Sequence, residues 1–589
     1  MPSRLTTIGE RFLPARIRQE RVEERLASQQ KAEAEAAHVL RAEKIAARRA
    51  ALLAQDPDLR EISGPEQSYF GRRVHTIVDT DARSRNFALV TDALEHAGLD
   101  YFLVPGRSPK RHVVGVRFAD RKAFLAALRD LYADTALYAL KPSSDRWPAD
   151  VALYADGALP TALKRQDTIR FGEILLGPDD QVLADLTQGC DVEFWRDGED
   201  LVAAATEPKT AERLAALRVQ APHDVLAGAL VAPRPNAVAD VLPADALVPA
   251  TRSIAGRSHP TWDAFRQQRI DATDFPIDVV YTWVDGDDPK LAAVREAHRP
   301  TPGKASRINT RETGTSRYTS RDELKYSLRS LQMYAPFIRN VFIVTDGQTP
   351  GWLNTAAAGV QVVDHKDIFS DPTALPVFNS HAIGTQLHHI DGLSERYLYF
   401  NDDVFLGRPI TPGHFFHSNG IAKLPFSPAQ LGLGAPHPDE PAPNSAGKNV
   451  RTLIQDTHGR FTVNKFMHTP HPQIQSVMRD LEKLFPEDLD RTSRSKFRAV
   501  TDIATAASLH HHHAYLTGRA VAGTYKLRYV DVALPDAQEK MTALARDRAF
   551  DFFCLNDVNT PADHQDRIAE EVHSFLEAYF PLPSRWEVG

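Results

Sequence analysis

Cysteine is nearly absent from this sequence of 589 residues, which contains only Cys190 and Cys554. Two cysteines cannot build a disulfide framework, and neither stands in a spacing typical of metal ligands. This excludes the small, disulfide-rich secreted class of proteins. We expect both thiols to be buried in a reducing compartment, which favours a cytoplasmic protein.

Long apolar runs are also missing. The first 30 residues contain no apolar core of signal-peptide type, and no stretch approaches the ~18 uninterrupted apolar residues of a membrane span. Any membrane contact is therefore expected to be peripheral, at the inner face of the plasma membrane.

Positive charge is not in excess either. The 70 basic and 77 acidic residues give a net charge of −7, which offers no general attraction for nucleic acid. With 42% hydrophobic residues the chain is globular, and at ~100 to 200 residues per domain its length predicts three or four units. The sequence does not decide whether the chain forms a homo-oligomer.

The first half divides by composition into three segments. Residues 1–65 are rich in Ala, Glu, Arg and Gln, which predicts a solvated helical arm; the alternative is a basic arm that lies on anionic lipid. Residues 66–230 mix helical patterns with short strands, as expected for an accessory α/β module with paired antiparallel strands. Residues 231–270 are rich in Pro and Ala, have little periodicity, and are expected to be a linker.

Apolar runs alternate with helical patterns in residues 271–525, which predicts a catalytic α/β domain with a central, mainly parallel sheet. The runs are IDVVYTWV, NVFIVTD, VQVVDH and RYLYFNDDVFL. Ser320 and Glu323 have capping-box spacing ahead of the helix between the first two runs. Residues 526–589 are expected to pack on this domain.

Acidic residues stand at the end of each run, namely Asp285, Asp346, Asp364 and the pair Asp402 and Asp403. One such Asp is an ordinary turn or helix-cap residue. Several at the carboxyl edge of one parallel sheet, where such folds hold ligands, favour a binding edge instead. Adjacent carboxylates are costly to bury without a cation, and this indicates a divalent metal.

Four segments of the second half resemble the signature blocks of the Stealth family, in the family's order. They are IDVVYTWVDGDDP, DELKYSLRSLQMYAPFIRNVFIVTDGQTPGWLN, FNSHAIGTQLHHIDGLSERYLYFNDDVFLG and the long block from KFMHTPHPQIQSV to HHHHAYLTG. The resemblance covers residues 275–525, and weaker likeness continues through FFCLNDVNT and YFPLPSRWE. The family comprises bacterial capsule and exopolysaccharide phosphotransferases and the eukaryotic N-acetylglucosamine-1-phosphotransferase of lysosomal enzyme tagging.

The resemblance implies transfer of a sugar 1-phosphate from a nucleotide sugar, commonly a UDP-sugar such as UDP-GlcNAc, to a hydroxyl of a growing polysaccharide or other glycan. The products would be a phosphodiester and UMP. The implied fold is of nucleotide-sugar transferase type, with a Rossmann-like or glycosyltransferase-A-like sheet. The implied cofactor is a divalent metal, Mg²⁺ in the first place and Mn²⁺ as the alternative.

By motif position the resemblance implies three catalytic residues, Asp403, His468 and Arg498. Asp402, Asp403 and Asp502 would hold the metal, and Thr501 is expected to cap a helix with Asp502 in its first turn. The residues expected to contact substrate are Asp285, Gly286, Arg329, Asp346, Asn379, His381, Asn401 and Asp502.

Gly384 departs from the family pattern, because FNSHAIG ends in glycine where relatives carry a Glu that is counted among the catalytic or substrate-holding residues. His381 and Gln386 are candidates to replace it. Two alternatives therefore stay open: an ordinary metal-dependent glycosyltransferase that releases UDP, and a non-catalytic nucleotide-sugar-binding protein.

Two other features have plainer interpretations. Consecutive residues spread around a helix, so the run His510 to His513 is expected to be structural or on the surface rather than a metal site. The Pro-rich stretch Pro425 to Asn444 predicts a long irregular loop, either a lid over the acceptor site or a disordered insertion.

Overall fold

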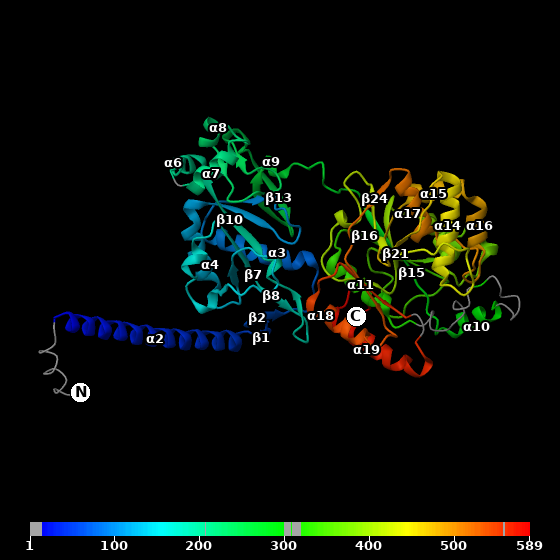
Figure 1. Cartoon of the computed structure of the whole chain (residues 1–589), viewed down its shortest axis with the longest axis horizontal. Helices are drawn as coiled ribbons and strands as arrows, with labels where there is room; N and C mark the ends of the chain where they lie inside the picture. Colours follow the sequence, from blue (N-terminus) through cyan, green and yellow to red (C-terminus); the bar gives the residue numbers. More distant parts are fainter. Residues whose placement is uncertain (1–14, 207, 300–307, 309–319, 558–559, 589) are drawn as a thin grey trace. The chain divides into compact units, whose positions relative to one another are not determined.

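The computed structural model describes residues 15–206, 208–299, 308, 320–557 and 560–588. They divide into two compact units (Figure 1), so the three or four units predicted from the length are wrong. The first unit runs to Arg266, apart from residues 75–82 and 177–181. These two short segments join the second unit, which contains the residues from Gln267 onward.

The first unit begins with a 41-residue helix, α2 (Ala15–Gln55). Its sequence contains neither glycine nor proline, and most of its side chains are exposed. Only its last turns pack on the unit, where Leu52 is buried and Arg49 pairs with Asp156 at 2.7 Å. The predicted solvated helix is confirmed for Ala15–Gln55, but residues 59–63 of the predicted arm form a strand, and contact with lipid stays a prediction.

An eight-stranded sheet organises the first unit, with the order β12-β11-β10-β7-β5-β6; β4 pairs in parallel with β10, and β3 pairs with β4. Its strands are β3 (Tyr101–Val104), β4 (Val113–Arg117), β5 (Tyr138–Leu140), β6 (Val151–Leu153), β7 (Thr168–Gly172), β10 (Cys190–Asp197), β11 (Leu230–Val231) and β12 (Val241–Leu242). A second sheet contains β1 (Leu59–Ser63), β2 (Ser68–Arg73), β8 (Ile174–Leu176) and β9 (Val182–Ala184). The helices are α3 (Asp79–His96), α4 (Arg121–Tyr132), α5 (Thr161–Lys164), α6 (Gly198–Ala203), α7 (Pro208–Leu217), α8 (His223–Ala227) and α9 (Asp263–Arg266).

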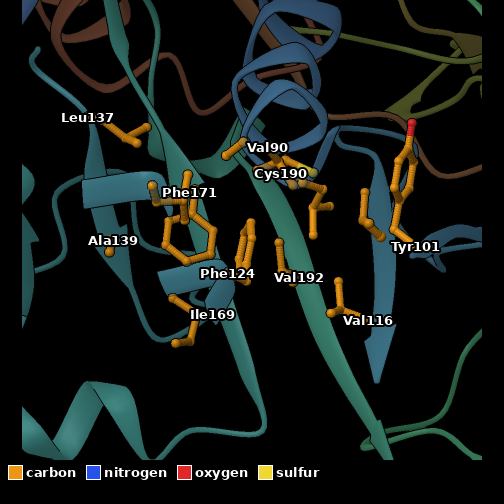
Figure 2. Packing of buried hydrophobic residues seen from close by; sticks show 14 of the residues in the cluster. Val90, Tyr101, Val116, Phe124, Leu137, Ala139, Ile169, Phe171, Cys190 and Val192 are labelled. Atoms are coloured by element: carbon orange, nitrogen blue, oxygen red, sulfur yellow. The ribbon is translucent and has the colours of Figure 1, made fainter. Parts of the chain in front are cut away.

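The core of this unit lies between the large sheet and helices α3 and α4. The apolar positions of α4 recur with helical spacing, and Phe124 from this face meets Phe171 of β7 edge to face at 5.7 Å (Figure 2). Val192 of β10 lies in the same cluster. Cys190 is buried there as well, as predicted for a structural thiol.

Residues 231–270 differ from the predicted linker. Strand β12 extends the large sheet, and β13 (Pro249–Ile254) and β14 (Arg257–Trp262) form an antiparallel hairpin. This hairpin is fixed to β3, because the Thr261 hydroxyl donates to the Leu103 carbonyl at 2.9 Å. The strands are short and include prolines, so their sequence shows little alternation.

The second unit is built on a five-stranded sheet with the order β17-β16-β15-β18-β23. The first four strands are parallel and β23 is antiparallel, so the predicted mainly parallel sheet is confirmed. In the register, Thr282 lies beside Val344 and Asn401, and Thr345 lies beside Asp364. The carboxyl ends of four strands therefore share one edge, as the acidic strand ends predict. The strands are β15 (Ile277–Thr282), β16 (Ile338–Thr345), β17 (Val360–Asp364), β18 (Arg396–Asn401) and β23 (His471–Ile474).

Helices cover this sheet, and α14 to α17 gather on one side of it (Figure 1). The helices are α10 (Pro289–Ala297), α11 (Glu323–Tyr334), α12 (His365–Ile368), α13 (Ser380–Gly384), α14 (Ala442–His458), α15 (Gln475–Leu484), α16 (Pro486–Ser493), α17 (His510–Leu516), α18 (Ala537–Asp547) and α19 (Gln565–Tyr579). The capping box predicted for α11 is wrong. Its N-cap is Asp322 with a φ of 61°, and the Glu323 carboxylate accepts the Arg321 amide at 2.6 Å.

The run RYLYFNDDVFL is two strands rather than one. The chain leaves the five-stranded sheet after Asn401, turns at Asp402 and Asp403, and enters β19 (Val404–Leu406). Strand β19 pairs with β26 (Phe552–Asn556), which pairs with β25 (Leu527–Asp531). The acidic pair therefore lies where the chain passes from one sheet to another, and the C-terminal residues pack beside it.

The Pro-rich stretch is neither one long loop nor, in this structure, a disordered insertion. It contains β21 (Phe426–Gln430), which pairs with β22 (Asn464–Phe466), and the start of α14. Two side chains of α14 hold the segment that connects β21 to this helix. Lys448 pairs with Glu440 at 2.7 Å, and Arg451 donates to the Gly432 carbonyl at 2.9 Å. A role as a lid stays a prediction. A further pair of strands is β20 (Ala422–Leu424) and β24 (Ala520–Ala522).

Candidate active site

Asp403 and His468 meet at the carboxyl edge of the five-stranded sheet, although 65 residues separate them. Nε2 of His468 lies 3.0 Å from Oδ1 of Asp403 and 3.2 Å from the amide nitrogen of Asn401. The second carboxylate oxygen of Asp403 accepts from Asn556 at 3.2 Å and from the Cys554 thiol at 3.4 Å. The structure thus brings together the two predicted catalytic residues and Asn401. Asn556 and Cys554 carry no sequence signal that identifies them as partners of Asp403.

Opposite charge sets the ionisation of this pair. Burial, the largest single effect, raises the pKa of Asp403 and lowers that of His468, but the charge and hydrogen bond of each partner, with the Cys554 and Asn556 bonds to Asp403, together outweigh it. The pKa of Asp403 is therefore held below its usual value and that of His468 above. The result is a charge-assisted contact between a carboxylate and an imidazolium.

Asp402 shows the opposite behaviour. Burial, then the nearby charges of Glu323 and Asp403, raise its pKa well above the usual range. Burial also raises the pKa of Glu323. Three carboxyl groups that disfavour one another's charge form an environment that a divalent cation would stabilise, so Asp402 and Asp403 fit the predicted metal. Glu323 is a site residue that the sequence reasoning missed.

A second group of predicted residues surrounds the start of α13. Asn379 caps this helix by accepting the His381 amide at 3.0 Å, and its own amide donates to Oδ2 of Asp502 at 2.8 Å. Nδ1 of His381 lies 3.8 Å from the same oxygen. Arg498 donates to the Ser380 hydroxyl at 2.7 Å. Four predicted residues are thus assembled here.

The two groups are neighbours, because the charge of Arg498 acts on both His468 and Tyr399 of β18, where it opposes the net rise of each pKa. Asp502 lies on the Asn379 side of this arrangement. It does not lie in a helical first turn as predicted: it precedes a π-helical turn, Thr505–Leu509, whose N-cap is Ala504. Its buried carboxylate accepts the Ala499 amide at 2.9 Å. A metal-binding role for Asp502 stays a prediction.

The acidic residues after β15 build a turn and a helix cap. Oδ1 of Asp285 accepts the Asp287 amide at 3.0 Å, and Asp288 caps α10 by accepting the Lys290 amide at 2.8 Å. Gln348 joins this turn to the end of β16 through the main chain of Asp285 at 3.0 Å. The turn interpretation is therefore confirmed, and the turn, which includes Gly286, lies on the predicted binding edge.

Asp346 and Asp364 follow the neighbouring strands on the same edge. Asp364 caps α12 in a capping box with Asp367. Asp346 is half-buried at the end of β16, and its charge acts on the buried ring of His365. Contact of Asp346 with substrate stays a prediction.

Arg329 lies elsewhere than predicted. Its guanidinium makes a two-fold contact of 2.9 Å with Glu587, pairs with Glu577 at 3.1 Å and donates to the Phe580 carbonyl. It is buried, with 5% of its surface exposed. Arg329 therefore fastens α11 to the C-terminal residues, and the prediction that it contacts substrate is not supported by its surroundings.

The run His510 to His513 is buried, so a surface position is excluded and a structural one remains. Nδ1 of His471 lies 3.0 Å from Nε2 of His511, and the Ile474 amide donates to His510 at 2.9 Å. Burial lowers the pKa of His510 to about 3 and that of His512 to about 4, so these rings are neutral at pH 7.

Comparison with known proteins identifies the chain. Models of conserved regions 1, 2, 3 and 4 of Stealth proteins match residues 275–300, 317–424, 467–515 and 542–589. An exopolysaccharide phosphotransferase of Streptomyces coelicolor is 39% identical over 524 residues, which are 87% of this chain and 83% of that protein. The chain belongs to the Stealth family. It is accordingly a transferase.

Another relative matches a shorter part of the chain. The exopolysaccharide phosphotransferase CpsY of Mycobacterium tuberculosis is 39% identical over 348 residues, 59% of this chain and 64% of that protein. Among solved structures, the galactosyltransferase LgtC in complex with donor and acceptor sugar analogs is 12% identical, with a TM-score of 0.27, and covers 52% of this chain and 96% of its own. No helix among the described residues is long and apolar enough to cross a membrane.

The Stealth position that departs from the family pattern, Gly384, is the last residue of α13. A Cβ atom there would lie 3.7 Å from the Cβ atom of Ala506, an ordinary contact. Of the two candidate substitutes, Gln386 is engaged with Ser370 at 3.2 Å and with Thr385 at 2.9 Å. His381 lies beside Asp502 instead, which makes it the better candidate.

Proposed function

We propose that this Stealth protein transfers a sugar 1-phosphate from a UDP-sugar to a glycan hydroxyl in exopolysaccharide or capsule synthesis, and releases UMP. The observation that supports this proposal most directly is the Asp403–His468 pair at the carboxyl edge of the parallel sheet. The exopolysaccharide phosphotransferases among its relatives support the reaction class. The fold of the second unit is proposed to be of glycosyltransferase-A type.

In the proposed reaction the acceptor hydroxyl oxygen attacks the phosphorus that bears the sugar. A new P–O bond forms, the P–O bond to the uridine phosphate breaks, and UMP leaves with the bonding electrons. The hydroxyl proton passes to the carboxylate of Asp403, because His468 is already protonated, and Asn556 and Cys554 hold this carboxylate in place.

Charge neutralisation and positioning supply most of the catalysis of phosphoryl transfer. Arg498 is proposed to neutralise a phosphate oxygen, since it is the cation beside His468. Asp402 and Asp403 would hold Mg²⁺, which when bound supplies positive charge next to the phosphates. The turn from Asp285 to Asp288 is proposed to border the nucleotide.

The decisive experiment identifies the released nucleotide. The purified chain is incubated with a panel of nucleotide sugars and an oligosaccharide acceptor, and products are analysed by nucleotide chromatography and phosphorus NMR. UMP together with a phosphodiester signal is expected. UDP as the sole nucleotide product would instead show an ordinary glycosyltransferase, and binding of a donor without any release would show a non-catalytic binder.

A further inference from the structure

Three side chains outside the Asp403 site converge on one point. His388 and His389 belong to the short helical turn Leu387–His389, and Glu482 belongs to α15. Nε2 of His388 lies 3.0 Å and Nε2 of His389 lies 2.8 Å from the same oxygen, Oε1 of Glu482. All three atoms lie within 4.8 Å of one another.

The orientation of His389 resembles that of a metal ligand. Its Nδ1 lies 2.9 Å from the Ile368 carbonyl oxygen at the end of α12, and the Ser370 hydroxyl is 3.5 Å away. Donation of Nδ1–H to the main-chain carbonyl leaves the lone pair on Nε2, which faces Glu482. Metal-binding histidines are typically fixed in this way by the nitrogen that does not bind the metal.

His388 supplies a second, independent observation. Its ring is completely buried, Nδ1 has no hydrogen-bond partner in the described part of the chain, and Nε2 has no well-aligned one, although it lies 3.0 Å from Glu482. A buried polar group without a well-made hydrogen bond destabilises the folded chain. A cation between Nε2 and the carboxylate would be the missing partner of this ring.

We infer that His388, His389 and Glu482 form a binding site for Zn²⁺, separate from the Asp402 and Asp403 carboxylates. Two imidazoles and one carboxylate suit Zn²⁺ better than Mg²⁺, which prefers oxygen ligands. Three protein ligands leave the fourth position of a tetrahedral site to water. Glu482 and His389 are partly exposed, which gives the ion a route from solvent.

The site would join parts of the chain that flank the candidate active site. Residues 387–389 follow α13, whose first turn carries His381, and α15 follows the His468 segment. The Gln475 side chain already links α15 to the His388 carbonyl at 2.9 Å. A bound Zn²⁺ would fix these two segments to each other at a second point.

Zinc binding to the full-length chain tests this directly. The protein is stripped with a chelator, and Zn²⁺ is titrated in competition with a colorimetric chelator while thermal melting is followed. One equivalent is expected to bind and to raise the melting temperature. His389→Gln and Glu482→Gln should each weaken binding at least 100-fold, and His564→Gln, which changes an exposed histidine, should not.

Two further variants separate this site from its alternatives. His468→Ala should still bind one equivalent of Zn²⁺. This variant changes the other group of possible metal ligands in the described residues, Asp403, His468 and Cys554. Arg479→Gln should tighten binding, since the charge of Arg479 acts on both histidines. Absence of binding by the native chain, or binding that survives both His389→Gln and Glu482→Gln, would show that the cluster is only an ion pair. X-ray absorption of the loaded protein should show nitrogen and oxygen ligands at about 2.0–2.2 Å.

Discussion

Asp403 is a carboxylate with partners on both of its oxygens. One oxygen faces His468 and the other accepts from Asn556 and Cys554, so the side chain is held from both sides. The sequence predicted Asp403 and His468 because both stand in family blocks. It could not show Asn556 and Cys554, because their contact depends on β26 pairing with β19 across 150 residues of chain.

We expect Asp403→Asn and His468→Ala each to lower turnover by about 10²- to 10⁴-fold, because Asp403 receives the acceptor proton and the His468 imidazolium holds the Asp403 carboxylate in position. Steady-state kinetics measures the loss, and thermal melting checks the fold. Asp490→Asn, which changes an exposed carboxylate in a surface ion pair, should leave turnover unchanged. Near-native turnover of both site variants would refute the assigned roles.

Gly384 offers a test by addition rather than removal. A Cβ atom fits at this position, so Gly384→Ala should fold normally. Gly384→Glu restores the family carboxylate and is expected to raise turnover, or to admit a donor that the native chain uses poorly, because positioning is a large part of phosphoryl-transfer catalysis. Turnover is compared across one donor panel. A folded Glu variant that is slower on every donor, with an unaffected Ala variant, would show that His381 or another residue has replaced the Glu.

At the scale of elements, α11 shows why periodicity predicts a helix better than it predicts the role of a residue. Its apolar stripe identified the helix, but the partners of Arg329 lie about 250 residues away in the C-terminal segment. The same limit applies to RYLYFNDDVFL, whose apolar pattern continues across a change of sheet. It also applies to residues 231–270, where proline interrupts short strands.

Arg329→Met and Glu587→Gln should each destabilise the second unit by about 3–5 kcal/mol, because each leaves the buried partner without its counter-charge or full hydrogen bonding. The KM for donor should stay unchanged. Denaturant unfolding and initial-rate kinetics measure the two quantities. A raised KM with unchanged stability would instead place Arg329 in the substrate site.

The first unit also contains a buried ion network, and Asp191 of β10 is at its centre. It pairs with Arg170 at 2.6 Å and with Arg234 at 2.7 Å, and Arg111 lies 3.5 Å away. Burial raises its pKa, but the arginines outweigh burial and hold the pKa below the usual value. The stabilisation is therefore complete above the unfolded pKa of about 3.9 and is lost as the pH falls through the lower folded value.

Asp191→Asn should accordingly cost about 3–5 kcal/mol at pH 7, because Arg170 is buried and would lose its counter-charge. The variant should also lose part of the acid dependence of unfolding below about pH 4. Denaturant titrations of both proteins at pH 3, 4 and 7 measure this. An equal loss of stability at all three pH values would mean that folding does not lower the pKa of Asp191.

At the scale of the whole molecule, the two units have separate hydrophobic cores and separate buried ion networks. Periodicity predicted this division in outline, because both halves show repeated helix and strand patterns. The boundary was missed, since the first unit continues to Arg266 through strands with little periodicity. Because each unit has its own core, each can unfold in its own transition. The whole chain then does not follow the two-state behaviour of a single domain.

We therefore expect two calorimetric transitions from the intact chain. Asp191→Asn should lower only one of them and Arg329→Met only the other, each by about 6–12 °C if the cost is about 3 kcal/mol and each kcal/mol shifts a unit of this size by about 2–4 °C. A UDP-sugar should raise only the transition that Arg329→Met lowers, because the candidate active site lies wholly in the second unit and a ligand stabilises the state that binds it. A single transition that both variants shift would show that the units unfold together.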